Sequence, residues 1–175
     1  MTQPASKNPQ VILETSLGDV KLELFPDKAP VTVANFLTYV REGFYDGTIF
    51  HRIISNAIVQ GGGFKPGLVY QEPTHPAIVN EAKNGLSNER GAIAMARAMP
   101  IDSAATQFFI NVVDNPALDH RGDDPLEFGY AVFGRVTEGM EVVSKMTWIP
   151  TGPTGDHRNV PQEDIVILKA TVLEG

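Results

Sequence analysis

Apolar residues in this chain fall mostly into short runs separated by glycine, proline and asparagine, and this pattern constrains the fold more than any other feature. Within residues 19–25, Val20, Leu22 and Leu24 alternate with polar neighbours, as in a strand with one buried face. Residues 11–15 form a similar run just before it, so the two segments predict a hairpin. Further strands are predicted at residues 91–96, 130–136 and 165–172.

Helical spacing is restricted to two segments. After Pro30, which suits a first helical turn, apolar residues recur at positions i, i+3, i+4 and i+7, namely Val33, Phe36, Leu37 and Val40. Gly43 is expected to end this helix, and residues 140–146 predict a second, short helix with Thr137 as its N-cap. Many short strands with two helices favour a mainly β barrel or sandwich over a layered α/β fold.

The composition fits one globular domain. With 175 residues, of which 42% are hydrophobic, the chain is long enough to bury a sizeable core. Residues 1–9 contain two prolines among small polar residues and predict a loose tail, which leaves residues 10–175 as the domain. Residues 64–90 are rich in proline, glycine and asparagine and predict a long ordered loop, a kind of segment that often frames a site.

The charge and the apolar pattern argue against several classes of protein. A formal net charge of -7 without a basic run argues against a nucleic-acid partner. No apolar stretch is long enough to cross a bilayer, and residues 1–10 lack the apolar segment of a signal peptide. We therefore expect a cytoplasmic protein, and a periplasmic one stays open if a leader has been removed. The absence of cysteine excludes disulfides and thiol catalysis.

Charged and amide side chains interrupt three short apolar segments, where such groups are costly unless they have a role. The segments are Phe50-His51-Arg52-Ile53-Ile54, Gln60-Gly61-Gly62-Gly63-Phe64 and Gln107-Phe108-Phe109-Ile110-Asn111. Because residues two apart in a strand share a face, Gln107, Phe109 and Asn111 are predicted on the outer face, and Phe108 and Ile110 inside.

The same alternation pairs Ile58 with Gln60, and Arg52 with Phe50 and Ile54. A groove built from these elements would have an apolar floor and a polar rim, as a proline pocket needs. The predicted groove residues are Arg52, Ile58, Gln60, Gln107 and Phe109. The three glycines at positions 61–63 lack the Lys-Ser/Thr of a phosphate loop, so we interpret them as a bulge or tight bend.

These segments together resemble the cyclophilin family of peptidyl-prolyl isomerases, and in particular its bacterial branch. The resemblance extends from about Val11 to the C-terminus, with several motifs in the family's order. It implies an eight-stranded antiparallel barrel capped by two α-helices, with an interior filled by side chains and a substrate bound outside. It also implies an isomerase that needs no cofactor, metal or covalent step.

The resemblance assigns roles to individual positions. It implies that Arg52 is the catalytic guanidinium, which donates a hydrogen bond toward the prolyl nitrogen, and that Gln60 holds the peptide and the arginine. The implied substrate-binding residues are His51, Ala57, Ile58, Ala96, Arg97, Gln107, Phe109, Ala117, Leu118 and Tyr130. We interpret the histidine of this set as structural, because the other histidines lie far away in sequence and no carboxylate stands at metal-site spacing.

Two positions depart from the family's pattern. Ala57 replaces a pocket phenylalanine, and Ala117 stands where relatives carry tryptophan, phenylalanine or another large residue. We expect reduced or redirected activity on short proline peptides and weak cyclosporin binding, because aromatic contacts are worth a few kcal/mol. Two other readings stay open: residues 120–128 fold over to rebuild the wall, or the wider groove takes a bulkier neighbour of proline.

The sequence therefore predicts a monomeric peptidyl-prolyl cis-trans isomerase that acts on proline-containing peptides and on unfolded or folding proteins. The rival hypothesis is a non-catalytic proline-peptide-binding or chaperone module on the same scaffold. A serine hydrolase is disfavoured because the chain has no nucleophile elbow.

Overall fold

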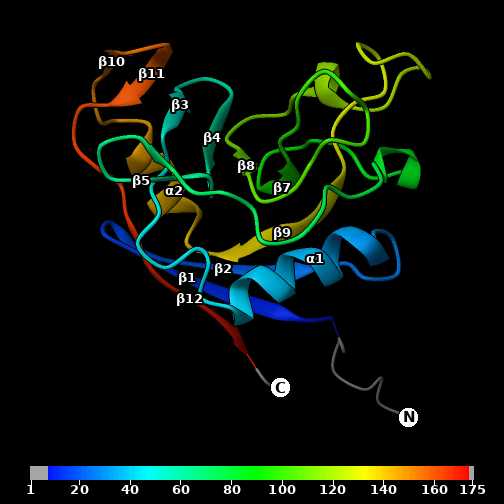
Figure 1. Ribbon diagram of the computed structural model, residues 1–175, viewed down its shortest axis with the longest axis horizontal. Coiled ribbons are helices and arrows are strands. Elements are labelled where there is room, and N and C mark those ends of the chain that lie inside the picture. Colours follow the sequence, from blue (N-terminus) through cyan, green and yellow to red (C-terminus); the bar gives the residue numbers. More distant parts are fainter. Residues whose placement is uncertain (1–7, 174–175) are drawn as a thin grey trace.

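An eight-stranded antiparallel sheet is the central element of the computed structural model, which describes residues 8–173 (Figure 1). The strand order is β12-β1-β2-β9-β7-β8-β4-β3. The bounds are β1 (Gln10–Thr15), β2 (Gly18–Leu24), β3 (Arg52–Ile54), β4 (Ile58–Gly61), β7 (Ala92–Met95), β8 (Phe108–Asn111), β9 (Val132–Glu138) and β12 (Ile167–Leu173). The predicted hairpin at the N-terminus is confirmed as β1 and β2.

The two ends of the sheet meet and close it into a barrel. The Phe50 amide donates to the Ile165 carbonyl at 2.9 Å, and the Ile167 amide donates to the Thr48 carbonyl at 2.8 Å. The interior is filled by side chains, among them Phe36, Phe108 and Phe133, which are fully buried. The predicted fold class, a mainly β antiparallel barrel of eight strands, is confirmed, and buried side chains pack its interior.

Within residues 8–173, two α-helices accompany the barrel, α1 (Pro30–Arg41) and α2 (Met140–Met146). The first ends before Gly43, as predicted, and its apolar stripe packs into the barrel core. The predicted N-cap of the second was wrong. Thr137 belongs to β9, and Gly139 takes the N-cap position with a left-handed backbone (φ +96°). A side chain there would collide with the Asp19 carbonyl of β2, so this turn requires glycine.

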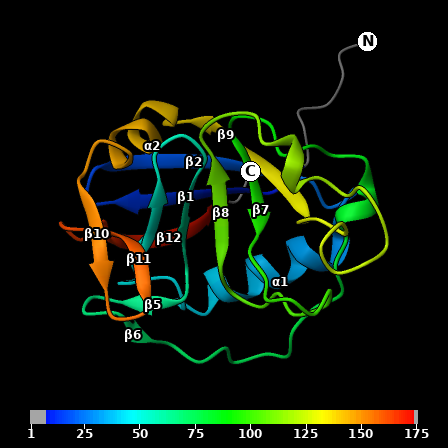
Figure 2. The same ribbon diagram turned by 90° about the horizontal axis from the view of Figure 1, so that it is seen from above.

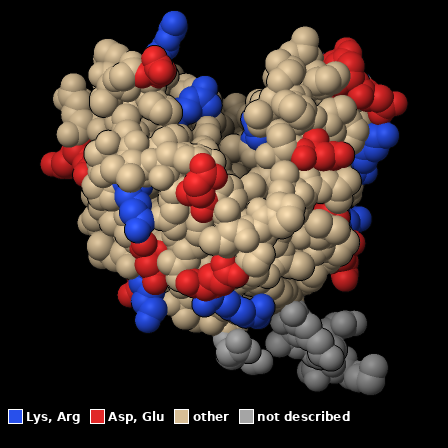
Figure 3. Space-filling model, viewed as in Figure 1, with Lys and Arg blue, Asp and Glu red and all other residues tan. Residues whose placement is uncertain are grey.

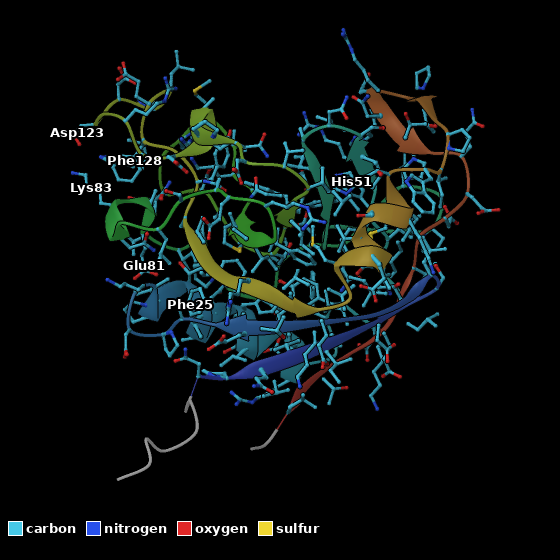
Figure 4. All side chains as sticks on the ribbon, turned by 180° about the vertical axis from the view of Figure 1, so that it is seen from behind. Phe25, His51, Glu81, Lys83, Asp123 and Phe128 are labelled. Atoms are coloured by element: carbon cyan, nitrogen blue, oxygen red, sulfur yellow. The ribbon has the colours of Figure 1, made fainter. Side chains whose placement is uncertain are left out.

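The long loop predicted at residues 64–90 is tied to α1. It holds the short strands β5 (Phe64–Lys65) and β6 (Val69–Tyr70) and the 3-10 helix η1 (Ala82–Asn84). The first helical turn of α1 has no side-chain cap of its own, and the Glu81 carboxylate accepts hydrogen bonds from the Val31 and Thr32 amides instead. This carboxylate lies between the loop and the helix (Figure 4). These hydrogen bonds fix the C-terminal part of the loop to the first turn of α1.

The last two residues of the predicted N-terminal tail, residues 8 and 9, are bonded to the sheet. The Pro9 carbonyl accepts a hydrogen bond from the Leu24 amide at 2.9 Å, and the Asn8 side chain donates to Glu23. Asn8 and Pro9 are therefore joined to the sheet, and the rest of the predicted tail lies outside the described residues. Within residues 8–173, no helix is long and apolar enough to cross a membrane.

Candidate active site

One row of paired residues crosses five neighbouring strands on the outer face of the barrel. Arg52 of β3 is paired with Gln60 of β4, which is paired with Phe109 of β8. Phe109 is paired with Ala94 of β7, which is paired with Val132 of β9. These strands lie side by side in Figure 2. The antiparallel register therefore brings the arginine and the amide of one hairpin next to an aromatic ring from a distant part of the sequence.

Apolar side chains on this outer face form a small cluster separate from the core. The Phe109 side chain is 2% exposed and packs there with Ile58, Ala94 and Val132. Phe108 and its strand neighbour Ile110 belong to the barrel interior instead, as the alternation predicted. The cluster is the apolar floor expected of the groove.

The predicted pairing of Phe50 with Arg52 on one face was wrong. Phe50 is fully buried in the core, where its ring contacts Phe108 at 5.9 Å between centroids. The reason is that β3 begins only at Arg52. The preceding residues bond instead to residues 165–167 at the barrel seam, so the regular alternation does not extend back to Phe50.

A chain of polar side chains stands over the edge of the floor. The Arg52 Nη1 donates to Gln60 Oε1 at 3.1 Å, and Gln60 Nε2 donates to Gln107 Oε1 at 3.1 Å. Arg52 is exposed, whereas Gln60 is half-buried. The arginine is therefore oriented by one amide, which a second amide orients in turn, and among residues 8–173 no other hydrogen bond of its guanidinium is formed.

These groups border a cavity of about 330 Å³, which Figure 3 shows as a hollow between the β3–β4 side and the loops after β7 and β8. Its lining residues are Arg52, Ile54, Ala57, Ile58, Gln60, Ala96, Arg97, Phe109, Asn115, Ala117, Leu118 and Tyr130. The structure thus brings ten predicted site residues together and adds Ile54 and Asn115. Gln107 lines a neighbouring cavity, and His51 lines neither.

A network of asparagine side chains fixes the far wall of the cavity. Asn111 is fully buried, and its Nδ2 donates to Asn88 Oδ1 and to the Ala92 carbonyl at 3.1 Å each. Asn115 Nδ2 donates to Asn111 Oδ1 at 2.8 Å and to the Ala57 carbonyl at 3.0 Å. Asn111, predicted on the groove face, therefore serves to support the wall. Sequence reasoning missed Asn115, whose position depends on this network.

The family described as cyclophilin type peptidyl-prolyl cis-trans isomerase/CLD matches residues 10–172. The chain belongs to this cyclophilin family. Peptidyl-prolyl cis-trans isomerase B of Escherichia coli is 51% identical over 94% of the chain and 99% of the relative. The cyclophilin is also 52% identical to a peptidyl-prolyl cis-trans isomerase of Streptomyces antibioticus, over 93% of the chain and 98% of that relative. It is therefore an isomerase whose substrates are proline-containing peptides or proteins.

Solved structures agree with the fold of this cyclophilin. The crystal structure of a cyclophilin type peptidyl-prolyl cis-trans isomerase from Cryptosporidium parvum has a TM-score of 0.80 at 27% identity, and covers 96% of this chain and 99% of its own. A structure of the same protein in the presence of the dipeptide Ala-Pro has a TM-score of 0.78 at 28% identity, over 95% and 99% of the two chains. The barrel and its two helices are thus the family fold.

A second cavity of about 300 Å³ adjoins the first and shares Gln60, Ala96 and Arg97 with it. Its other lining residues are Tyr70, Pro73, Ala98, Ser103, Ala105, Thr106 and Gln107. Sequence reasoning named only Gln107 among these. The available signal was the proline- and glycine-rich composition of residues 64–90, which placed a loop near the site without identifying which side chains it contributes.

Both alanine positions border the first cavity. Ala57 is half-buried and Ala117 is exposed on the 3-10 helix η2 (Pro116–Leu118). Residues 120–128, one predicted source of a replacement wall, do not line this cavity. They fold toward Lys83 instead: its Nζ lies 2.9 Å from Asp123 Oδ1 and 5.6 Å from the centroid of the Phe128 ring (Figure 4). Residues 120–128 therefore do not replace an aromatic wall at either alanine.

His51 precedes Arg52 in the chain but is turned away from the groove. It is 3% exposed, and its ring packs against Phe64 at 4.5 Å and His157 at 5.8 Å between centroids. The Nδ1 atom is buried without a hydrogen-bond partner among the described residues. This placement fits a structural role, and the expected contact of His51 with substrate has no support in the geometry. Among residues 8–173, no cluster of three potential ligands is placed to hold a metal ion.

Burial makes His51 a source of acid sensitivity. Chiefly burial, and secondarily the charges of His157 and Arg52, lower its pKa from 6.5 to about 4. The unfolded chain therefore binds a proton at higher pH than the folded protein does. The free energy of unfolding should fall as the pH drops from about 6.5 to about 4, by up to about 3 kcal/mol from this group. Chemical denaturation of the protein and of His51→Phe across this range measures the effect.

The His51→Phe substitution keeps an aromatic ring in the same contacts and removes the buried unpaired nitrogen. We expect similar stability at pH 7 and a shallower loss of stability between pH 6.5 and pH 4 in the variant. Equal losses in both proteins would mean that other groups cause the acid sensitivity.

Gly63 lies against the Gln107 side chain. Its backbone is outside the left-handed region, so alanine is compatible with the backbone itself. A Cβ atom there, however, would stand 2.6–2.7 Å from Gln107 Cγ, Cδ and Nε2. We expect Gly63→Ala to displace Gln107 and release Gln60, with a loss of about fivefold in kcat/KM, because a neutral hydrogen bond is worth about 1 kcal/mol.

NMR measurement of cis/trans exchange in a short Xaa-Pro peptide, without a coupled protease, measures this loss. Gly152→Ala is the matched control, since its Cβ would meet its nearest neighbour, Gln162 Nε2, at an ordinary 3.6 Å. Unchanged activity in Gly63→Ala, with Gln107 displaced in its structure, would show that the amide chain does not support turnover.

Proposed function

We propose that this cyclophilin accelerates cis/trans isomerisation of Xaa-Pro bonds in folding or folded proteins, with Arg52 as the principal catalytic residue. The observation that supports this most strongly is the polar chain Arg52–Gln60–Gln107 at the rim of a cavity floored by Phe109. The proline ring would rest on Phe109 and Ile58, with its nitrogen toward the guanidinium. Gln60 would hold the arginine and the bound peptide.

The barrier to be lowered comes from amide resonance and is about 18–20 kcal/mol. Rotation localises the nitrogen lone pair, so a donor aimed at that nitrogen stabilises the twisted state more than the planar one. A charge-assisted hydrogen bond contributes about 1.5–3 kcal/mol, or about one to two decades of rate. Burial of the amide in a drier pocket disfavours its charge-separated resonance form, and a held proline ring favours rotation of the flanking chain.

Alanine in place of two aromatic residues favours a lower catalytic efficiency than a pocket with an aromatic wall would give. Ala57 and Ala117 both line the cavity, so a bound proline ring would lack two aromatic contacts there and water would reach its amide more easily. The same observation supports the alternative function, a non-catalytic module that binds proline-containing segments. The hypothesis that the wider groove takes a bulkier neighbour of proline is also compatible with alanine at these two positions. The retained polar chain is what favours turnover over binding alone.

We further propose that the partners are proline-containing segments of unfolded or folding proteins. We also propose that the protein is a monomer that needs no cofactor or metal. Its proposed compartment is the cytoplasm. The acidic surface, with a net charge of -7, argues against nucleic acid as a partner. Sedimentation of the purified protein tests the monomer directly.

The test of function pairs turnover with binding. Exchange NMR on a short Xaa-Pro peptide with catalytic amounts of protein measures isomerisation, and titration of the same peptide measures its affinity. The expected result is faster exchange at protein concentrations well below the peptide concentration. If the peptide binds without any acceleration, the enzyme hypothesis fails and the binding module takes its place. A peptide with alanine in place of proline controls for nonspecific binding.

A further inference from the structure

Arg97 follows β7 and lies on the boundary between the two cavities, where it lines both. Its guanidinium, however, is directed at the protein's own backbone. Nε donates to the Gly129 carbonyl at 3.0 Å, and Nη2 donates to the Pro125 carbonyl at 2.7 Å. Nη1 donates to the Ala98 and Met99 carbonyls at 3.0 and 3.2 Å. Four carbonyls therefore occupy most of the five N–H groups that an arginine possesses.

These four carbonyls belong to two loops on the same side of the groove. Ala98 and Met99 lie in the segment after β7, which Ser103 closes by accepting from the Ala98 amide at 2.9 Å. Pro125 and Gly129 lie in the segment that leads to β9. The guanidinium fork is thus a direct link between the two loops, and its planar donors suit several fixed carbonyls at once.

The Gly129 carbonyl is also held from a third segment. Asn80 Nδ2 donates to it at 3.1 Å and to the Ile101 carbonyl at 3.2 Å. The backbone of Gly129 is left-handed (φ +85°), and a Cβ there would approach the Asp119 carbonyl carbon to 2.6 Å. This turn therefore has little freedom, so Arg97 anchors the two loops to a rigid point.

The face of the guanidinium reaches the proline pocket through aromatic rings. Its central carbon lies 5.1 Å from the centroid of the Tyr130 ring, a cation–π distance. Tyr130 meets Phe109 edge-on, with 5.6 Å between centroids and 80° between planes. Phe109 is the floor of the cavity. A continuous series of contacts therefore runs from Arg97 to the surface on which the proline ring would rest.

We propose that Arg97 is a positioning residue that sets the width of the groove: it clamps residues 97–103 to residues 125–129 and holds Tyr130 against Phe109. This inference rests on the proposed function, and it replaces the expectation that Arg97 binds the substrate directly. The clamp determines how well a peptide is held in both cavities at once. Its loss affects binding more than the rotation step, because Arg52 and Gln60 belong to β3 and β4, outside the clamped loops.

The experiment compares Arg97→Met, which keeps the apolar stem, with Arg97→Lys, which keeps the charge without the fork. Arg135→Met is the matched control, since Arg135 also donates two hydrogen bonds, to Glu23 on β2, but lies outside both cavities. We measure kcat and KM separately on a Xaa-Pro peptide, and amide hydrogen exchange of the free proteins at residues 120–130.

In both Arg97 variants we expect KM to rise about tenfold with kcat within about threefold, as for a loss of uniform binding. Hydrogen exchange at residues 120–130 should quicken about tenfold, with β7 amides unchanged as the internal reference. Arg135→Met should alter neither quantity. Full rescue by lysine would overturn the clamp, because it would show that charge alone is sufficient. A raised KM with unchanged exchange would overturn it too, since Arg97 would then contact the substrate.

Hydrogen exchange is measured without substrate, so its outcome does not depend on turnover. If the unaltered protein fails to isomerise peptide, the proposed function fails while the clamp can still be judged from exchange and from peptide affinity. If Arg97→Met alters exchange throughout the barrel, Arg97→Lys decides: unchanged loop exchange and an unchanged KM in that variant contradict the proposal.

Discussion

Arg52→Ala should lose about 10- to 100-fold in kcat/KM, because one charge-assisted hydrogen bond in the transition state is worth about 1.5–3 kcal/mol. The side chain is exposed and donates to Gln60 alone among its described protein partners, so its removal leaves no buried group unpaired except one amide oxygen at the groove. We therefore expect the fold to survive. Exchange NMR on a Xaa-Pro peptide measures the loss, and the thermal unfolding midpoint checks the fold.

Peptide affinity separates the two possible roles of this arginine. If Arg52 acts on the rotating amide, kcat falls and the dissociation constant of the peptide changes little. Arg52→Lys should recover part of the rate, since it restores a charge but cannot donate to Gln60 and the prolyl nitrogen in the same geometry. A loss confined to affinity, with kcat retained, would move the chemistry away from Arg52. Arg135→Ala controls for the removal of an arginine elsewhere.

The sequence predicted those features that depend on local periodicity. The alternation in residues 107–111 correctly separated Phe109 from Phe108 and Ile110, because side chains in a strand alternate whatever the surroundings are. The helix from Pro30 was equally local. The cyclophilin fold and the isomerase class came from the resemblance, which the family match over residues 10–172 confirms.

Features that depend on contacts between distant segments could not be predicted. Phe50 turned into the core because its amide bonds to Ile165 at the barrel seam, in a distant part of the sequence. The turn before α2 uses Gly139 because β2 passes close to it, which no local signal reports. The role of Arg97 also depends on distant segments. Its position matched the family's groove, but its N–H groups donate to carbonyls of two loops. The catalytic and binding roles of the site residues stay predictions until the variants are measured.

Ala117→Trp should strengthen binding of a proline peptide by about tenfold, because partial burial of a large aromatic side chain contributes about 1.5 kcal/mol. Ala117 is exposed on η2 at the open border of the cavity, so an indole there can lie against the proline ring without displacing the core. The rate should rise as well, because the new wall excludes water from the amide. Titration and exchange NMR on one peptide measure both effects.

Cyclosporin provides a second measurement of the same wall. The unaltered protein should bind it weakly, and Ala117→Trp should bind it at least about tenfold more tightly, for the same reason of buried aromatic area. Leu168→Trp, which places an indole at an exposed position of β12 away from the cavity, controls for nonspecific adhesion. Tight cyclosporin binding by the unaltered protein would contradict the hypothesis that the two alanines weaken binding in the pocket. So would an Ala117→Trp variant with unchanged peptide affinity, and the open side would then be a substrate-accommodating feature rather than a lost contact.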